Sequence, residues 1–513
     1  MCRLCDEGKP QDHTGSLRGS RRDFLKASAA TGVAAAGIDL FTARPAAAHG
    51  DDDGPEDSGR PGRRYVIRDG HVMSMDPTVG DFAQADVLVE GKKILDVGPN
   101  LRARGAGEID ARGRIVMPGF IDTHHHQFET ALRSFLADGL LFNDGKPHGA
   151  INYFEHILGK FAPVYRPRDV YINELFGSLS QLDAGVTTVH DISQIHHSPE
   201  HSDAAIKGIA DSGRRAAFGY FESAGAVPGN QYPQDARRIK KRYFSSDDQL
   251  ITMTMGGEIY LPGFDVAWAL GRELKLQVVA HIVGSFGMGP TFDALAASNQ
   301  FGPDNLFIHM TGMSDMSWEK VKEARAGVSL AVPIEMNMRH GMPPILKTLA
   351  MGIQPSLSVD VECTLTADMF TQMRTTMALQ RALVNQMALE TNNPPKLPEL
   401  LTTRDVLRFA TVEGAKDLRL GRKVGSLTPG KEADIIILDA EAINVAPLNV
   451  VPGAVVSLME RSNVETVIVA GKVRKWKGRL LDVNLRKLRE ELEASRDYLF
   501  DAARIPQDLF RPN

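Results

Sequence analysis

The sequence has 513 residues, 43% hydrophobic and 24% charged, with a net charge of −5. This composition is that of a folded globular protein and excludes a wholly disordered chain, while the length predicts more than one domain. Because the net charge is negative, there is no surplus of basic residues to neutralise phosphates, and nucleic acid is not an expected partner.

The first 48 residues have the features of an export signal. Arg21 and Arg22 precede a short apolar stretch at 27–36, and small residues follow at 46–48. This order is typical of secretory signals, and the paired arginines resemble the twin-arginine type, which implies the twin-arginine export machinery. We expect a signal peptide over 1–48 and a periplasmic or extracellular protein. No later segment is long and apolar enough for a membrane span.

Short β-rich runs lie near both ends of the chain. After an acidic linker at 49–63, one group occupies 64–117, and a second group returns at 411–482. Each group has too few strands for an independent sheet, so we expect the two ends to pair in one small β-sandwich. The last segment, 483–513, begins as a charged amphipathic helix that we expect on the surface.

Residues 118–410 alternate short apolar runs with helical stretches. Buried strands that alternate with helices indicate an α/β fold, either a TIM barrel or a doubly wound sheet. No glycine-rich dinucleotide fingerprint follows the first strand, which weighs against the doubly wound sheet. We therefore predict a (β/α)8 TIM barrel as the catalytic domain.

Single polar residues stand where several apolar runs of this barrel end. They are His124, His126, His281, His309 and Asp360. The carboxyl ends of barrel strands meet at one face, so these side chains are expected to converge there. Because side chains alternate along a strand, His124 and His126 should point the same way and His125 the opposite way.

Three imidazoles and a carboxylate would suit one divalent ion, with Zn²⁺ favoured over Fe²⁺, Mn²⁺ or Ni²⁺. The expected ligands are His124, His126, His281 and Asp360. Such an ion lowers the pKa of its water to about 7; Asp360 would accept the water proton and His309 would polarise the substrate. The alternative is that each histidine only caps its strand with a backbone hydrogen bond, which would require several coincidences.

Two longer motifs resemble those of a known family. Pro-Gly-Phe-Ile-Asp-Thr-His-His-His at 118–126 is similar to the first-strand signature of the amidohydrolase superfamily, and the motif at 425–438 resembles its C-terminal sandwich motif. The resemblance runs from about Tyr65 to Leu480 and is greatest to the branch with cytosine deaminase, S-adenosylhomocysteine deaminase and atrazine chlorohydrolase. It implies one metal on the ligands above, His309 at the substrate, and a possible homo-oligomer.

The chain departs from this branch at one position. Deaminases of the branch usually carry a Glu three residues after the third metal histidine, as a proton shuttle to the leaving group, whereas here His281 is followed by Gly284. The departure weakens nucleobase deamination and leaves hydrolysis in general intact. Glu222 and Glu258 are possible substitutes near strand ends.

Four polar residues near strand ends are candidates for contact with a small-molecule substrate. Glu258 follows the fourth apolar run and could also bind a second metal ion. A second ion usually needs a bridging group such as a carboxylated lysine, and this run has no lysine, so one metal is favoured. Glu335 and Asn337 occupy the expected seventh loop, and His190 ends the second strand. Structural or solvated roles are open for each of them.

These residues predict a metal-dependent hydrolase acting through a metal-bound hydroxide on C–N bonds, other than peptide bonds, of an amide, cyclic amide or amino-substituted heterocycle. The same centre would also serve a hydrolytic dehalogenase, an esterase or a C–C hydrolase. A further alternative is an exported protein that binds a metal or ligand without turnover. The pair Asp360 and His309 argues against it, because binding alone requires no water-activating groups.

Overall fold

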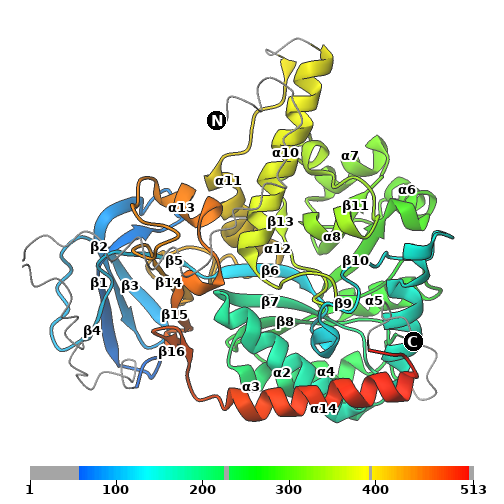
Figure 1. The fold of residues 1–513 in the computed structure, drawn as a ribbon, viewed down its shortest axis with the longest axis horizontal. Coiled ribbons are helices and arrows are strands. Elements are labelled where there is room, and N and C mark those ends of the chain that lie inside the picture. Colours follow the sequence, from blue (N-terminus) through cyan, green and yellow to red (C-terminus); the bar gives the residue numbers. More distant parts are fainter. Residues whose placement is uncertain (1–56, 225–229, 392–395, 508–513) are drawn as a thin grey trace, which may run out of the picture. The chain divides into compact units, whose positions relative to one another are not determined.

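The computed structural model describes residues 57–224, 230–391 and 396–507. The predicted signal peptide at 1–48 and part of the predicted linker at 49–63 lie outside these ranges. The described residues form two sheets with helices around one of them (Figure 1). No helix among them is long and apolar enough to cross a bilayer.

A parallel eight-stranded sheet forms the barrel, and each strand is hydrogen-bonded to the next one along the chain. The strands are β6 (Phe120–His125), β7 (Val186–Ser193), β8 (Arg215–Tyr220), β9 (Ile251–Gly256), β10 (Gln277–Val283), β11 (Asn305–Thr311), β12 (Gly327–Leu330) and β13 (Ser356–Leu357). Nearly all of their residues are buried, as expected for strands covered by helices on the outside.

Helices follow the strands and cover the outside of the barrel (Figure 1). They are α2 (Pro167–Asp183), α3 (Pro199–Ser212), α4 (Ala236–Tyr243), α5 (Phe264–Glu273), α6 (Gly289–Ala297), α7 (Asp315–Ala324), α8 (Val332–Asn337), α9 (Ile345–Ala350), α10 (Met369–Thr391), α11 (Thr403–Arg408) and α12 (Gly414–Asp417). Local sequence sets their ends: α3 begins with Pro199 at its first turn and stops at Gly213, whose φ of 69° suits glycine.

The second sheet combines both ends of the described chain. Its strands are β1 (Arg64–Met73), β2 (Asp81–Glu90), β3 (Lys93–Gly98), β4 (Gly107–Asp110), β5 (Arg114–Pro118), β14 (Ile435–Asp439), β15 (Val464–Val469), β16 (Lys472–Trp476) and β17 (Arg479–Leu480). The two ends meet where β14 pairs antiparallel with β5. Side chains from both groups, such as Tyr65, Val87, Ile435 and Ile468, share one core. The predicted fold class is therefore confirmed.

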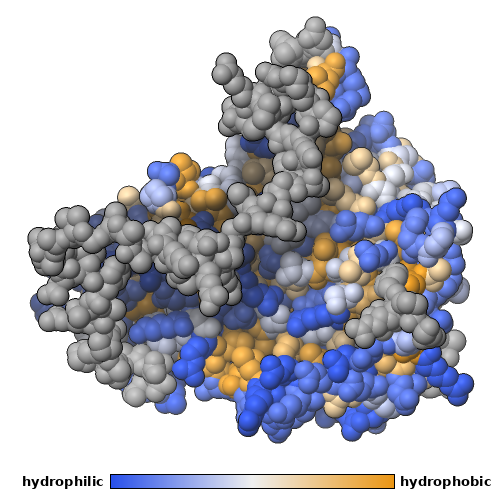
Figure 2. Space-filling model, in the orientation of Figure 1, coloured by the Kyte–Doolittle hydropathy of each residue, from blue (hydrophilic) through white to orange (hydrophobic). Residues whose placement is uncertain are grey.

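Two more helices complete the described chain, α13 (Val451–Ser457) and α14 (Leu485–Ala503). Leu492, Leu499 and Phe500 lie on the buried side of α14, and the Phe500 ring packs edge-on against Phe135 and Phe161. The visible face of α14 is mostly hydrophilic (Figure 2). The helix thus forms where the charge pattern predicted an amphipathic surface helix.

A buried ionic cluster joins the barrel to the second sheet. Arg215, at the start of β8, is 1% exposed and donates to Asp434 Oδ2 at 2.8 Å and Glu432 Oε2 at 2.6 Å. Both carboxylates lie next to β14 and are also buried. Because every member of the cluster is removed from water, loss of one partner leaves an uncompensated charge.

Replacing Arg215 by Ala should lower the free energy of unfolding by about 3–5 kcal/mol. Asp434 would remain buried without its counter-charge, and Glu432 would keep only the more distant Lys92 and Lys93, at 3.7 and 3.9 Å. The matched control is Arg237→Ala, which breaks an ion pair with Glu273 in which both partners are more than half exposed. That control should leave stability nearly unchanged. Chemical denaturation measures both, and equal losses would contradict the assignment.

Candidate metal centre and pocket

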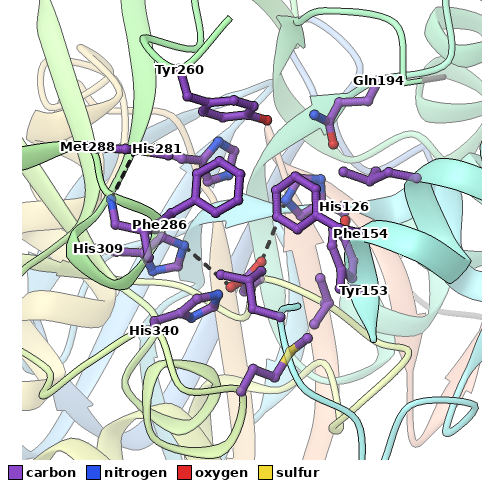
Figure 3. A pocket seen from close by; sticks show the side chains of 16 residues that line it. His126, Tyr153, Phe154, Gln194, Tyr260, His281, Phe286, Met288, His309 and His340 are labelled. Carbon is purple, nitrogen blue, oxygen red and sulfur yellow. Dashed lines mark hydrogen bonds and ion pairs between the residues drawn. The ribbon is translucent and has the colours of Figure 1, made fainter. Parts of the chain in front are cut away.

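Five side chains predicted from the sequence, His124, His126, His281, His309 and Asp360, lie at the carboxyl end of the barrel. Figure 3 shows three of them, His126, His281 and His309, around the pocket. Nε2 of His124 lies 3.0 Å from Nε2 of His126 and 3.0 Å from Nε2 of His281. Asp360 Oδ1 lies 3.4 Å and 3.6 Å from Nε2 of His124 and His126. Its Oδ2 lies 3.5 Å from Nε2 of His309. Four strands, β6, β10, β11 and β13, bring these groups together.

The donor set fits a divalent ion. Ligands that share one ion at about 2.0–2.2 Å lie roughly 3.0–3.5 Å apart, which is the spacing observed here. Burial lowers the pKa of His124 and His126 well below the usual value, so their ring nitrogens are neutral and able to coordinate. Burial raises the pKa of Asp360, and a cation beside it would favour its ionised form.

The strand alternation predicted for the triplet is observed. His125 forms a bridge with Asp360 through its backbone, which closes the barrel between β6 and β13. Its side chain is buried away from the cluster, with Nδ1 at 3.7 Å from Asp122 Oδ2. Two of the three consecutive histidines therefore face the site, as a period of two requires.

Two site residues have left-handed backbone conformations. His309 has a φ of 71° and Asp360 a φ of 72°. For residues with a Cβ this conformation costs roughly 1–3 kcal/mol each and is typical of functional sites. The surrounding barrel holds both residues in this conformation, so their side chains face each other.

Two buried carboxylates hold histidines of the site from behind. His281 Nδ1 lies 2.5 Å from Glu258 Oε1, and His309 Nδ1 lies 3.0 Å from Glu335 Oε1. Burial alone would lower the pKa of His281, but the charge and hydrogen bond of Glu258 outweigh it and raise that pKa. An Nδ1–H that donates to Glu258 leaves the Nε2 lone pair facing the cluster.

A second buried acid lies behind Glu258. Oε1 of Glu222 accepts the backbone N–H of Glu258 at 2.6 Å. The pKa of Glu222 is raised to about 8, mainly by burial and secondly by the negative charge of Glu258, so Glu222 is protonated at neutral pH. Neither Glu222 nor Glu258 lines the pocket.

The four residues expected at the substrate lie elsewhere. Glu258 and Glu335 bond to histidines of the site, and His190 Nδ1 lies 3.0 Å from the carbonyl oxygen of Thr123 inside the barrel. Asn337 is exposed at the end of α8. None of the four lines the pocket. Glu258, Glu335 and His190 thus lie behind the pocket wall, and their role toward a substrate stays a prediction.

The pocket over the cluster is mostly apolar and aromatic. Its walls include Phe154, Tyr260, Phe286, Met288, Met338 and Val361. The Phe154 and Phe286 rings stack at 4.6 Å in front of the cluster (Figure 3). The cavity volume is about 50 Å³, which holds a few water molecules. These residues come from loops after the strands, where no periodic pattern could have revealed them.

Gly284 is fixed by the backbone of the neighbouring strand. A Cβ at this position would lie 2.5 Å from the carbonyl oxygen of Thr311 and 3.0 Å from Cα of Gly312. Such contacts are too short for any side chain without a shift of the backbone. The departure noted in the sequence is therefore built into the packing of β10 against β11.

Residues 115–474 match the family model described as "Amidohydrolase family". The 5'-deoxyadenosine deaminase of Methanosarcina acetivorans is 27% identical over 450 residues, which cover 85% of this chain and 98% of that protein. The 5-methylthioadenosine/S-adenosylhomocysteine deaminase of Pelotomaculum thermopropionicum is 25% identical over 451 residues, which cover 83% of this chain and 97% of that protein.

Two solved structures share the fold. An adenosine deaminase from Xanthomonas campestris with bound zinc superposes with a TM-score of 0.74 at 22% identity, covering 86% of this chain and 99% of the other. A mutant atrazine chlorohydrolase from Arthrobacter aurescens, complexed with zinc and atraton, gives a TM-score of 0.71 at 19% identity, covering 84% and 100%. At these identities the likeness concerns the fold alone.

Replacing Glu258 by Gln should weaken metal affinity by about 10–100-fold, because the amide no longer holds His281 in the coordinating orientation. Competition with a chelator, followed by metal analysis, measures the effect. Glu319→Gln, an exposed change on α7, is the control and should leave affinity unchanged. Unchanged affinity in Glu258→Gln, with only KM raised, would instead indicate that Glu258 contacts substrate.

Proposed function

Because the chain belongs to the amidohydrolase family, we propose that it hydrolyses the C–N bond of an amino-substituted heterocycle and releases ammonia or an amine. The prediction of a metal-dependent hydrolase of C–N bonds other than peptide bonds is confirmed at the level of the family. The observation that carries the proposal is that two groups of candidate ligands share His124 at one end of the pocket: His124 with His126 and His281, and His124 with His309 and Asp360.

We propose that His124, His126, His281 and Asp360 hold the ion. Two groups of ligand atoms share His124, and within each group the atoms lie within 4.8 Å of one another: His124 with His126 and His281, and His124 with His309 and Asp360. A nitrogen-rich set with one carboxylate suits one Zn²⁺, with Fe²⁺, Mn²⁺ and Ni²⁺ as alternatives. When bound, such an ion activates a water molecule for attack on carbon. The zinc in the adenosine deaminase of the same fold supports the choice of metal.

Asp360 and His309 are the groups that would transfer protons in the reaction. Asp360 Oδ2 faces His309 Nε2 at 3.5 Å, so a proton taken from water by the carboxylate has a second holder nearby. Glu335 fixes the other side of the His309 ring. In the balanced reaction the water oxygen bonds to carbon and the C–N bond breaks. One water proton leaves on the ammonia or amine, and the other stays on the product at its ring nitrogen or oxygen.

A second candidate is hydrolytic removal of a leaving group that departs as an anion, such as a halide. The observation that favours it is Gly284, since the backbone leaves no room there for the carboxylic acid that would protonate an amine. An atrazine chlorohydrolase of similar fold supports this option. Paired amino and chloro derivatives of one heterocycle would distinguish the two reactions.

Replacing His309 by Asn should retain the metal and lower kcat by about 100-fold or more, because the second proton holder is lost. Metal analysis and ammonia release on a panel of amides, lactams and aminated heterocycles measure the two effects. His148→Asn, an exposed histidine outside the site, is the control. Full activity of His309→Asn would contradict the proposed role, and no turnover of any compound by the loaded protein would favour the binding-protein alternative.

We also propose that the protein is exported through the twin-arginine machinery to the periplasm or beyond. The support lies in the sequence alone: Arg21 and Arg22, the apolar stretch at 27–36 and the small residues at 46–48. The twin-arginine route exports folded proteins. An enzyme that uses this route can therefore bind its metal in the cytoplasm before export.

Changing Arg21 and Arg22 together to Lys should retain the protein in the cytoplasm, because the paired arginines are the feature on which the signal depends. Cell fractionation followed by immunoblotting measures the distribution. Arg18→Lys, a nearby conservative change outside the pair, should be exported normally. Normal export of the double variant would overturn the proposal.

A further inference from the structure

We propose that Gln194 recognises the substrate by a hydrogen bond, and that the substrate is a small, uncharged, planar heterocycle without a sugar or charged substituent. The inference rests on the proposed function and specifies its substrate class. It is argued from two unpaired polar atoms in the pocket, Gln194 Oε1 and His340 Nδ1, and from the absence of Lys, Arg and Glu among the described residues that line the pocket.

Gln194 is a buried amide that faces the cavity. It directly follows β7, is 5% exposed, and its backbone oxygen accepts the N–H of Ala224 at 2.7 Å. Its side-chain Oε1 has no hydrogen-bond partner within the described residues. Figure 3 shows the carboxamide pointing into the cavity. Leaving a buried acceptor unpaired is unfavourable, so Oε1 is suited to accept an N–H from a ligand.

His340 supplies a second unpaired polar atom in the same cavity. It is 3% exposed, and its Nδ1 has no partner in the described part of the chain. Its ring lies 4.6 Å from that of His309, measured between centroids. Figure 3 places Gln194 and His340 on opposite sides of the cavity. A ring-shaped ligand with polar atoms on two edges could form a hydrogen bond with each of these two side chains.

The remaining wall accepts a flat apolar surface. Phe154 and Phe286 are stacked with an interplanar angle of 16°, and Tyr260 meets Phe286 edge-on at 4.9 Å. Aromatic side chains at the rim of a pocket favour stacking against a planar ring. In this conformation the two stacked rings narrow the cavity, so a ligand must displace them to reach the cluster.

The wall lacks groups that would compensate a charged substituent. Among the described residues that line the cavity there is no Lys, Arg or Glu, and Asp360 is the sole carboxylate. A charged substituent away from the cluster would lose water without gaining a counter-charge from these residues, and Gln194 Oε1 and His340 Nδ1 are too few to pair with the several hydroxyl groups of a sugar.

The test compares free heterocycles with their ribosides on the metal-loaded protein. Binding of adenine, cytosine and melamine, and of adenosine and cytidine, is measured by titration calorimetry, so that the result does not depend on turnover. We expect at least one free heterocycle to bind tenfold or more tightly than either riboside. Tighter binding of the ribosides, or binding of no free heterocycle, would overturn the substrate class.

Gln194→Met tests the recognition residue with nearly unchanged side-chain volume. Binding of the preferred heterocycle should weaken by 10-fold or more, while metal content is retained and the unfolding temperature is equal or higher, because an unpaired buried amide is removed. Gln300→Leu, an exposed glutamine, is the matched control. Unchanged binding in Gln194→Met would overturn the inference, whereas tight binding without turnover by the wild type would refute only the proposed function.

Discussion

The hydrogen bonds that close the barrel are also those that assemble the metal site. The last strand, β13, has two residues, and it meets β6 through the backbone of Asp360: its N–H donates to His124 at 2.9 Å, and its carbonyl accepts from His126 at 2.8 Å. Beneath them, Asp122 accepts the N–H groups of His124 and Val359. The candidate ligands therefore come together only in the closed barrel, so a metal bound there would stabilise the folded state.

Burial then sets the charge state that coordination needs. Burial lowers the pKa of His124, His126 and His309, which favours neutral rings, whereas at His281 burial is outweighed by Glu258, which raises the pKa. Glu258 and Glu335 lie behind His281 and His309 and bond to their Nδ1 atoms, and burial raises the pKa of Glu335, which favours its neutral form. The carboxylates orient the histidines and leave the pocket wall to apolar side chains.

The fold and the convergence of the candidate ligands could be predicted because both follow from strand periodicity. Apolar runs that alternate with helices indicated the barrel, and the position of His124 and Asp360 at strand ends placed them at one face. The polar residues around the site could not be assigned, because sequence does not tell whether a residue such as Glu258 faces a pocket or a neighbouring ring. Phe286 and Gln194 lie in loops, whose course depends on tertiary packing.

Gly284 connects the packing of the barrel to the choice of reaction. The Thr311 carbonyl occupies the space of a side chain at this position, so proton transfer is confined to the side of the cavity where Asp360 and His309 lie. Of the two groups proposed to recognise the substrate, Gln194 lies away from His309 (Figure 3), whereas the His340 ring lies 4.6 Å from the His309 ring. A change at Gln194 is therefore the one expected to alter recognition without disturbing proton transfer. The leaving group, rather than the metal ligands, is then the feature that this packing selects.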